Sequence, residues 1–250
     1  MSVLPSNISI FCNLEKLFLS NNQLTTLPFE ISLLTNLKVL CLDNNQLTNF
    51  SLAITKMSQL RVLDLNNNKI DNIPNDISQL IHLQDLYLSH NNLSALPIHI
   101  CKLGKLEVLQ LANNQLKTLP WTLYRMKHLQ ERYLSSNQFS VFPWAISKLF
   151  NLTVLWINNN KLTEIPSTIG NLSNLHELAC HYNVLSELPI AIGQLSELQT
   201  LALFNNQLTA LPKEIKGLIK LKKLALQNNK LKTLPSQIVE LTNLEKVNFR

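Results

Sequence analysis

The sequence predicts an α/β repeat solenoid, with a parallel β-sheet along one face and short helical turns along the other. A 23-residue unit, LxxLxLxxNxLxxLPxxIxxLxx, recurs without insertion or deletion from Leu14 to Asn243. Leucines at positions 4 and 6 of this unit alternate with variable residues at positions 3, 5 and 7, which is the period of a strand with one buried face. Because every unit has the same length, consecutive strands should point the same way and stack as a parallel sheet.

The repeat also predicts the organisation of the chain. We expect residues 1–13 to form a partial N-terminal repeat or cap, residues 14–243 to form ten repeats, and residues 244–250 to begin an eleventh, truncated repeat. No linker or change of composition interrupts the 250 residues, so a single domain is expected. Because the ends of a solenoid need polar caps, a truncated end could support self-association.

Two further positions of the unit are nearly constant. Position 9 is asparagine in all ten repeats, from Asn22 to Asn229, and an amide there can pair the backbone groups that the turn after the strand leaves free. All ten prolines stand at position 15, where the second full repeat has Ser51 instead. Proline suits a segment outside the sheet, so short 3₁₀ or one- to two-turn helical pieces should follow it.

Charge and composition limit the classes of function. Residues 1–212 hold thirteen basic and thirteen acidic residues, whereas residues 213–250 hold nine basic and three acidic ones and so carry the whole net charge of +6. No aromatic residues are interleaved with these lysines, so we interpret them as a solvated face and expect no nucleic-acid partner. No apolar run is long enough for a transmembrane segment, and no signal peptide is evident. The four cysteines fall at different phases of the repeat, which favours a reducing, cytoplasmic environment over a disulfide framework.

The LxxLPxxIxxLxxL half of the unit resembles the 23-residue class of leucine-rich repeats. Similar repeats occur in the Ras-group proteins of the scribble and erbin type, and in bacterial leucine-rich repeat proteins that include effectors delivered into a host cytosol. The resemblance covers residues 4–250. It implies a right-handed horseshoe with the sheet on its concave face, and a non-enzymatic scaffold that binds a protein or peptide there. The alternatives are the recognition arm of a larger ubiquitin ligase, kinase or GTPase, and a purely structural, self-assembling array.

Variable positions 3, 5 and 7 of the predicted strands should project from the concave face and contact the partner. They hold an aromatic group, which can anchor an interface, and carboxylates that edge it, so we expect a basic and apolar partner. The predicted binding residues are Asp64, Asp85, Tyr87, Gln110, Glu131, Tyr133, Trp156, Glu177, His181, Tyr182 and Phe204. The alternative is cross-strand stacking that only stiffens the sheet.

Two other features stand out against the repeat. Trp121 and Trp144 share position 16 of neighbouring repeats near Arg125, so they could form a second surface or a cation–π contact, although packing is the simpler interpretation. Arg132 stands at position 4, where the other full repeats have leucine. A buried unpaired guanidinium is costly, so Arg132→Leu is predicted to raise the melting temperature.

The sequence contains no pattern typical of catalysis, metal binding or cofactor binding. Cys180 should point into the core while the adjacent His181 points outward, so the two cannot bind one metal ion, and His99 with Cys101 is equally weak as a nucleophile pair. The four glycines are isolated, which excludes a phosphate-binding loop. We therefore expect no catalytic, metal or cofactor residues.

Overall fold

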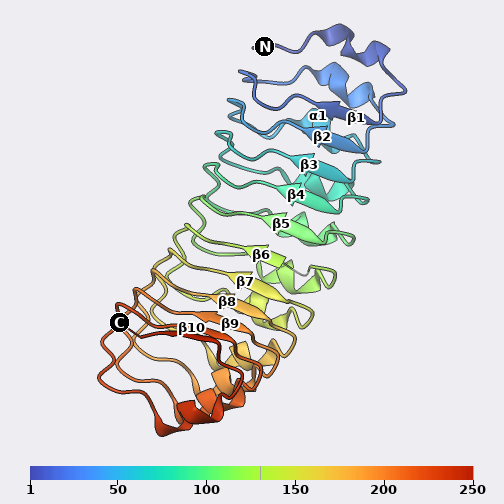
Figure 1. Ribbon diagram of the computed structural model, residues 1–250. Coiled ribbons are helices and arrows are strands. Elements are labelled where there is room, and N and C mark those ends of the chain that lie inside the picture. The colour runs from blue at the N-terminus through green and yellow to red at the C-terminus, as the bar shows by residue number, and fades with distance from the viewer. Residues whose placement is uncertain (130, 250) are drawn as a thin grey trace. The chain divides into compact units, whose positions relative to one another are not determined.

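The structure is a computed structural model that describes residues 1–129 and 131–249, with Glu131 and Arg132 described by their backbone alone. The chain divides into two compact units, Met1–Leu129 (unit 1) and Gln130–Arg250 (unit 2). Figure 1 shows the same coil repeated through both units, and each unit is a stack of such coils.

Each coil contributes one three-residue strand, and the strands within a unit pair in parallel in chain order. In unit 1 these are β1 (Lys16–Phe18), β2 (Val39–Cys41), β3 (Val62–Asp64), β4 (Asp85–Tyr87) and β5 (Val108–Gln110). In unit 2 they are β6 (Glu131–Tyr133), β7 (Val154–Trp156), β8 (Glu177–Ala179), β9 (Thr200–Ala202), β10 (Lys223–Ala225) and β11 (Lys246–Asn248). The paired residues of neighbouring strands are 23 apart in the sequence, as Leu40 pairs with Leu63, so equal positions of the repeat stack directly on one another.

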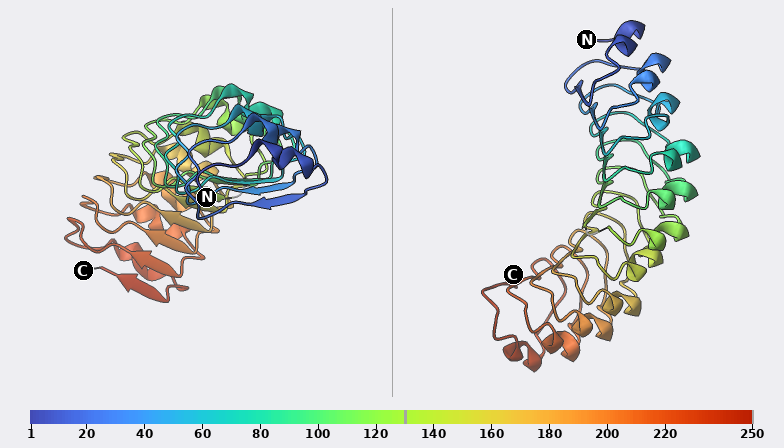
Figure 2. Two further views of the ribbon diagram at one scale, coloured as in Figure 1. Left: turned by 90° about the horizontal axis from the view of Figure 1, so that it is seen from above. Right: turned by 90° about the vertical axis from the view of Figure 1, so that its right-hand side faces the viewer.

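Short helices occupy the side of each unit opposite the strands (Figure 2). Unit 1 contains η1 (Ser6–Ile10), η2 (Phe29–Leu33), α1 (Leu52–Thr55), η3 (Asn75–Gln79), η4 (Ile98–Lys102) and η5 (Trp121–Arg125). Unit 2 contains η6 (Trp144–Lys148), η7 (Ser167–Asn171), η8 (Ile190–Gln194), η9 (Lys213–Gly217) and η10 (Ser236–Glu240). The η elements are 3₁₀-helices, as the sequence predicted.

The proline at position 15 explains where these helices begin. Each 3₁₀-helix follows a proline in an extended conformation, such as Pro28 with φ −67° and ψ 150°. Proline holds φ near this value and lacks a backbone donor, so it can precede a helix without losing a hydrogen bond. Ser51 takes the same conformation in the repeat that lacks proline, and its hydroxyl accepts a hydrogen bond from the backbone N–H of Ala53. The helix that follows Ser51 is α1, the α-helix in this set.

The core of each unit lies between its strands and its helices. In the second repeat Leu37, Leu40 and Leu42, at positions 1, 4 and 6, are fully buried, and so are Ile31 and Leu34 from the helix side of the preceding coil. Each residue stacks on its equivalent in the next coil, so the core is continuous within a unit and dominated by leucine and isoleucine.

The predicted asparagine ladder forms at position 9, and it joins neighbouring coils. Asn68 donates from its side-chain nitrogen to the carbonyls of Leu65 in its own coil and Leu42 in the preceding one, at 3.1 and 3.0 Å. Its side-chain oxygen accepts the backbone N–H of Leu47 at 3.0 Å. Equivalent bonds are made by Asn45, Asn91 and Asn183 among others. Each buried amide therefore satisfies backbone groups that the turn leaves without strand partners.

A second constrained position directly precedes this asparagine, and the sequence analysis did not identify it. Position 8 has a positive φ of 52–58° from Asn21 to Asn228. Asparagine tolerates this left-handed conformation better than most residues because its short polar side chain bonds locally. Seven of the ten residues at this position are asparagine, and the exceptions are His90, Ser136 and Tyr182.

Candidate functional site

The solvent-facing side of the strands, here called the sheet face, carries the variable positions 3, 5 and 7. Burial alternates along the strands as predicted, for example in β3 and β9, where the central leucine is buried and its neighbours are partly exposed. The sheet face therefore presents one row of side chains for each of these positions within each unit. Of the predicted binding residues, Tyr133, Trp156, Glu177, His181, Tyr182 and Phe204 lie in unit 2.

A first aromatic pair links β6 to β7 in unit 2. The rings of Tyr133 and Trp156 meet edge to face with their centroids 4.9 Å apart. The indole nitrogen of Trp156 donates a hydrogen bond of 2.8 Å to the carboxylate of Glu177 on β8. Trp156 nevertheless remains 37% exposed. Its neighbours thus fix the orientation of the indole while leaving part of it open to a partner.

A second aromatic cluster lies just beyond the ends of β8 and β9. The imidazole of His181 stacks on the ring of Phe204 at 4.2 Å with an interplanar angle of 12°. Tyr182 packs edge-on against both rings, at 5.7 Å from His181 and 5.5 Å from Phe204. We call His181, Tyr182 and Phe204 the ring cluster. Three rings from adjacent coils form a small rigid surface, and aromatic contacts of this geometry add to the gain from apolar burial.

Tyr182 is the strained member of the ring cluster. It stands at position 8 with φ 52°, a left-handed conformation that costs a bulky residue about 1–2 kcal/mol. The residue is 53% exposed, so burial of its ring within the fold offsets only part of this strain. Strain of this kind in a non-glycine residue is concentrated at functional sites.

His181 contributes to the ring cluster as a neutral ring. Burial lowers the pKa of His181 below the ordinary histidine value. Its Nδ1 atom is buried and has no hydrogen-bond partner among the residues that the structure describes. Burial costs a neutral imidazole less free energy than a charged one. At neutral pH the ring therefore serves mainly as a flat stacking surface for Phe204.

Beyond the ring cluster, the sheet face of unit 2 becomes flatter and basic. Position 5 is alanine in β8, β9 and β10, at Ala179, Ala202 and Ala225, where β6 and β7 carry tyrosine and tryptophan. A hollow of about 150 Å³ lies over β9–β11, and its lining includes Ala202, Ala225, Lys223 and Lys246. The small residues leave this hollow open, and the two lysines supply its positive charge.

The remaining predicted residues are in unit 1 or outside the described side chains. Asp64, Asp85, Tyr87 and Gln110 lie on β3, β4 and β5 of unit 1, with partly exposed side chains. The structure thus assembles two aromatic groups within unit 2 and places these four residues in the other unit. Glu131 and Arg132 form part of β6, and the predictions for their side chains lie outside the described residues.

The surroundings of Asp64 and Asp85 in unit 1 disfavour the ionised form of their carboxyl groups. Burial raises the pKa of Asp64, and the charge of Asp43 adds to this, although the backbone N–H of Asn66 donates to the carboxylate and acts in the opposite direction. Burial likewise raises the pKa of Asp85, with a smaller contribution from Glu107. A positively charged group brought near these carboxylates would stabilise their ionised form.

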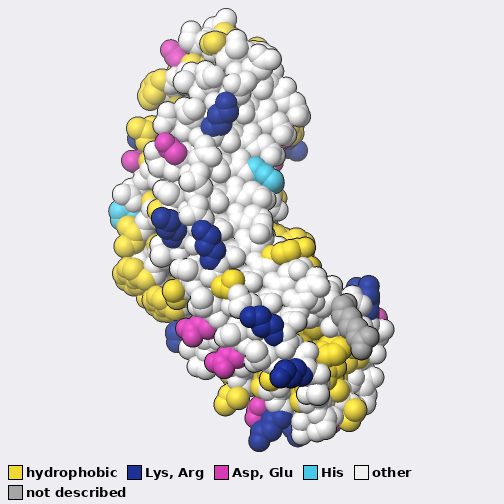
Figure 3. Space-filling view, turned by 90° about the vertical axis from the view of Figure 1, so that its left-hand side faces the viewer, with side chains coloured by type: hydrophobic (Ala, Val, Ile, Leu, Met, Phe, Trp, Pro, Cys, Tyr) yellow, Lys and Arg dark blue, Asp and Glu magenta, His cyan; other side chains and the backbone are white. Residues whose placement is uncertain are grey.

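The helix side offers a second candidate surface. Hydrophobic side chains gather along it in the space-filling view of Figure 3. Trp121 is 49% and Trp144 52% exposed, although they belong to different units. The guanidinium of Arg125 lies 5.8 Å from the Trp121 ring and 5.9 Å from that of Tyr124, so η5 contains a cation–π contact, the alternative to simple packing that the sequence left open. The suggested neighbourhood of Trp121 and Trp144 stays a prediction.

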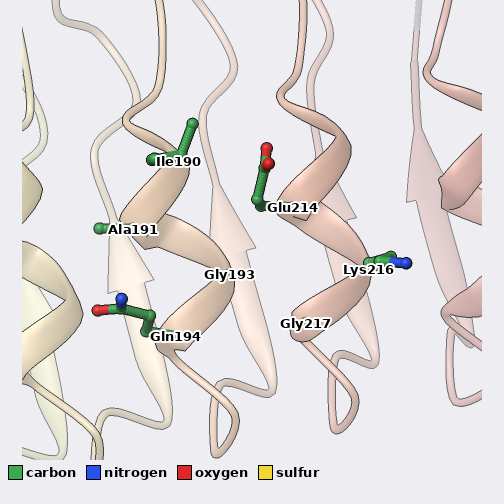
Figure 4. Close-up of a pocket in the computed structure, with 7 residues that line it drawn as sticks. All are labelled: Ile190, Ala191, Gly193, Gln194, Glu214, Lys216 and Gly217. Atoms are coloured by element: carbon green, nitrogen blue, oxygen red, sulfur yellow. The ribbon is translucent and has the colours of Figure 1, made fainter.

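A larger hollow of about 330 Å³ lies between η8 and η9 (Figure 4). Gly193 and Gly217 line it without side chains. In Figure 4 Glu214 points into the gap, whereas Gln194 and Lys216 point away from it. Lys216 instead forms an ion pair of 3.6 Å with Glu240 on η10. We interpret this hollow as the space left by two closely packed glycine-containing helices.

Among the described residues, no group of three or more histidine, cysteine or acidic residues could hold a metal ion. Cys180 is fully buried, and burial raises its pKa to about 12, so its thiol is unsuited to nucleophilic chemistry. No helix within the described part of the chain is long and apolar enough to cross a membrane.

Comparisons with known proteins agree with the repeat architecture. A family model described as "Leucine-rich repeat region" matches residues 44–141, and another, "Leucine Rich repeats (2 copies)", matches residues 12–53 and 150–193. The search of curated proteins found no match.

Several solved structures are similar over nearly the whole chain. A leucine-rich repeat protein of Leptospira interrogans is 39% identical, with a TM-score of 0.95 over 99% of this chain and 63% of its own. A plant peptide hormone receptor, RGFR1 in complex with RGF2, is 27% identical, with a TM-score of 0.73 over 99% of this chain and 49% of its own. A chain from the complex of Latrophilin 3, Unc5D and the leucine-rich repeats of FLRT2 is 27% identical, with a TM-score of 0.83 over 100% of this chain and 78% of its own. The present chain thus spans less than two thirds of the length of the first two.

Proposed function

Because the chain belongs to the leucine-rich repeat family, whose fold is a common scaffold for protein–protein interaction, we propose that it binds a protein segment without catalysing a reaction. The binding surface is the sheet face of unit 2, where the ring cluster and the Tyr133–Trp156 pair present exposed aromatic surface. The bound segment carries large apolar or aromatic side chains that pack against these rings.

The observation that carries this proposal is the conformation of Tyr182. The scaffold has asparagine at most copies of this position, yet a half-exposed tyrosine stands here in a left-handed conformation and packs on two further rings. A purely structural array would gain stability from asparagine. Contact with a partner gives a reason for the tyrosine, since half-buried aromatic residues are common anchors of interfaces.

Preorganisation is the mechanism by which this surface binds. Trp156 is oriented by Tyr133 and Glu177, and the ring cluster is held by mutual stacking. Side chains that are already ordered lose little conformational entropy on binding, so more of the contact energy appears as affinity. Two of the similar structures, RGFR1 with RGF2 and the complex that contains the leucine-rich repeats of FLRT2, were solved as complexes, which supports partner binding as a use of this fold.

The test uses a random 12-residue peptide library displayed on phage and selected on the full chain. We expect the enriched peptides to contain aromatic or large aliphatic residues. Binding of a synthesised peptide should weaken about tenfold or more in Trp156→Ala and Tyr182→Asn, as for loss of an interface anchor. His90→Asn is the matched control, because it replaces another left-handed residue of the same position in unit 1 and should leave affinity unchanged. Equal affinity of Trp156→Ala, Tyr182→Asn and wild type would overturn the proposal.

The basic character predicted for the partner rests on carboxylates of both units, among them Glu177 beside Trp156, and it stays a proposal. Asp64 and Asp85, with their raised pKa values, would favour a basic group on the sheet face of unit 1. We propose a reducing, cytoplasmic environment as well, supported by the four unpaired cysteines, Cys12, Cys41, Cys101 and Cys180.

A further inference from the structure

Two lysines on the sheet face of unit 2 stand side by side in an arrangement that disfavours folding. Lys223 on β10 pairs in register with Lys246 on β11, and both are exposed on the same face. Like charges directly opposite each other on neighbouring strands repel. Among the described residues neither lysine forms an ion pair.

The other lysines nearby show that this is not a general property of the basic segment. Lys216 pairs with Glu240, Lys220 with Glu197 at 2.6 Å, and Lys222 with Glu245 at 4.0 Å. Lys222 directly precedes Lys223 in the sequence, and its carboxylate partner lies at the equivalent position of the next coil. Lys213, Lys230 and Lys232 also form no ion pair among the described residues. Lys223 and Lys246 differ from them because they lack a carboxylate partner and also lie directly opposite each other on neighbouring strands.

The hollow of about 150 Å³ lies at this pair of charges. Its lining combines Lys223 and Lys246 with the alanines Ala202 and Ala225 and the polar side chains Thr200 and Asn248. The alanines make room at position 5, where a larger residue would fill the face. A carboxylate group is small enough for such a space and would find two ammonium groups and a hydroxyl or amide donor around it.

From this arrangement we propose that the hollow is a subsite for an acidic side chain, aspartate or glutamate, of the same segment that packs on the ring cluster. This inference rests on the proposed function and adds one requirement to it, an acidic residue in the bound segment. Phe204 stands at position 7 of its coil and the lysines at position 3 of theirs, so roughly 13 Å separates the two rows along the strand direction. An extended peptide covers this distance in about four residues.

The two halves of the surface therefore specify different parts of one ligand. The aromatic half contacts an apolar side chain, and the lysine half contacts a carboxylate about four residues away. An anionic membrane would also be attracted by two lysines, but it offers no aromatic or large aliphatic side chain for the ring cluster. A single-stranded nucleic acid can stack its bases on aromatic rings, but it binds through many phosphate contacts, whereas this hollow holds two lysines. A peptide segment satisfies both halves at once.

The experiment uses the same displayed library, in which the C-terminus of each peptide is fused to the coat protein, so that only side-chain carboxylates are presented. We expect enriched peptides to carry aspartate or glutamate about four residues from an aromatic residue. The double variant Lys223→Gln/Lys246→Gln should lose this preference while retaining the aromatic one. Lys213→Gln/Lys232→Gln is the matched control, because it removes the same charge from exposed lysines at η9 and between β10 and η10.

A selected peptide then provides the quantitative test by fluorescence anisotropy on the full chain. Replacing its acidic residue by glutamine should weaken binding to wild type and to the control variant roughly fivefold or more, as expected for a charge-assisted contact. The same replacement should have little effect on Lys223→Gln/Lys246→Gln. The subsite would be contradicted if this replacement reduced affinity equally for wild type, the control variant and Lys223→Gln/Lys246→Gln. It would also be contradicted if the replacement left the affinity of wild type unchanged.

The outcomes separate this inference from the proposed function. If aromatic peptides are enriched without an acidic preference, binding at the sheet face stands and the carboxylate subsite is wrong. If selected peptides bind Trp156→Ala and Tyr182→Asn as tightly as wild type, the proposed binding surface fails. A preference for polyanions such as oligonucleotides over the peptides would replace the acidic side chain with a different class of ligand.

Discussion

Tyr182 shows at the scale of one residue what the proposed binding surface costs in stability. Its left-handed conformation is one that asparagine adopts more readily, and asparagine occupies the same position in most other coils. We therefore expect Tyr182→Asn to raise the free energy of unfolding by at most about 1 kcal/mol. The relief of backbone strain stabilises the fold, and the lost contacts with His181 and Phe204 offset part of that gain.

Equilibrium denaturation in urea measures this effect, with Asn205→Tyr as the reverse substitution at the same position of the next coil. Asn205 also has a positive φ, of 53°, so tyrosine there should destabilise by about 1 kcal/mol or more. If Tyr182→Asn were strongly destabilising instead, the ring cluster would be a structural element of the fold and the strain argument for binding would lose its force.

Asp64 gives a prediction for pH dependence at the same scale. Burial raises its folded-state pKa above the unfolded value, so the folded protein binds this proton more tightly than the unfolded chain does. Stability should therefore fall as pH rises from about 3.9, the unfolded carboxyl value, through the raised folded value, and the loss persists at pH 7.

Asp64→Asn removes this ionisation and should raise stability at pH 7, on the order of 0.5 kcal/mol because solvent screens a partly exposed group. The gain should shrink toward pH 3, where wild-type Asp64 is protonated as well. Urea denaturation at both pH values tests this, with the exposed Asp71→Asn as the control. A gain that does not depend on pH would show that burial of the charge is not its cause.

At the scale of the helical elements, close packing of the 3₁₀-helices in unit 2 depends on glycine. A Cβ atom added to Gly193 in η8 would lie 2.2 Å from the backbone oxygen of Glu214 in η9. Neither this carbonyl nor the helix that holds it can move without disturbing the next coil. Gly193→Ala should therefore destabilise the protein by about 1–3 kcal/mol, as other overpacking substitutions do.

Gly104→Ala is the matched control, because a Cβ there would have no heavy atom within 4 Å of it. It should be neutral or stabilising by up to about 1 kcal/mol, since alanine restricts the unfolded chain. Thermal unfolding of the two variants provides the comparison. Equal effects would mean that η8 and η9 can separate easily and that the hollow between them is adaptable.

The sequence predicted those elements whose cause is local and periodic. The two-residue alternation around Leu40 predicted the strands, Asn68 and its equivalents predicted the ladder, and Pro28 predicted the start of a helix. The conformation at position 8 was missed although asparagine recurs there, because the neighbouring and invariant position 9 accounted for the turn by itself.

The details of the site were less predictable, because they depend on how side chains from different coils meet. Sequence alone identified Trp156 and Glu177 as candidates, but it could not show that the carboxylate of Glu177 accepts a hydrogen bond from the indole. Stacking of His181 on Phe204 likewise depends on rotamers that the repeat does not encode. The unpaired state of Lys223 became evident only after the partners of the neighbouring lysines were known.

At the scale of the whole molecule, the same architecture limits how far a local change can spread. Among the described residues, the strands of each unit pair with the strands directly before and after them, and the asparagine ladder reaches one coil back. Stability of a repeat protein is then close to a sum of terms for each coil and for each interface between neighbours. A substitution in one coil should loosen that coil and its neighbours first, instead of destabilising all coils equally.

Leu63→Ala tests this limit on the full chain. Leu63 is fully buried at the centre of β3, between Leu40 on β2 and Leu86 on β4, so the cavity should cost about 2–5 kcal/mol. We expect hydrogen exchange to accelerate most in peptides that cover β2–β4 and less with each further coil, while peptides of β8–β10 keep wild-type rates. Leu52→Ala, the same change at an exposed leucine of α1, should alter exchange little. Uniform acceleration along the chain would instead mean that the coils open together, and binding at the sheet face of unit 2 would then depend on every core position in the protein.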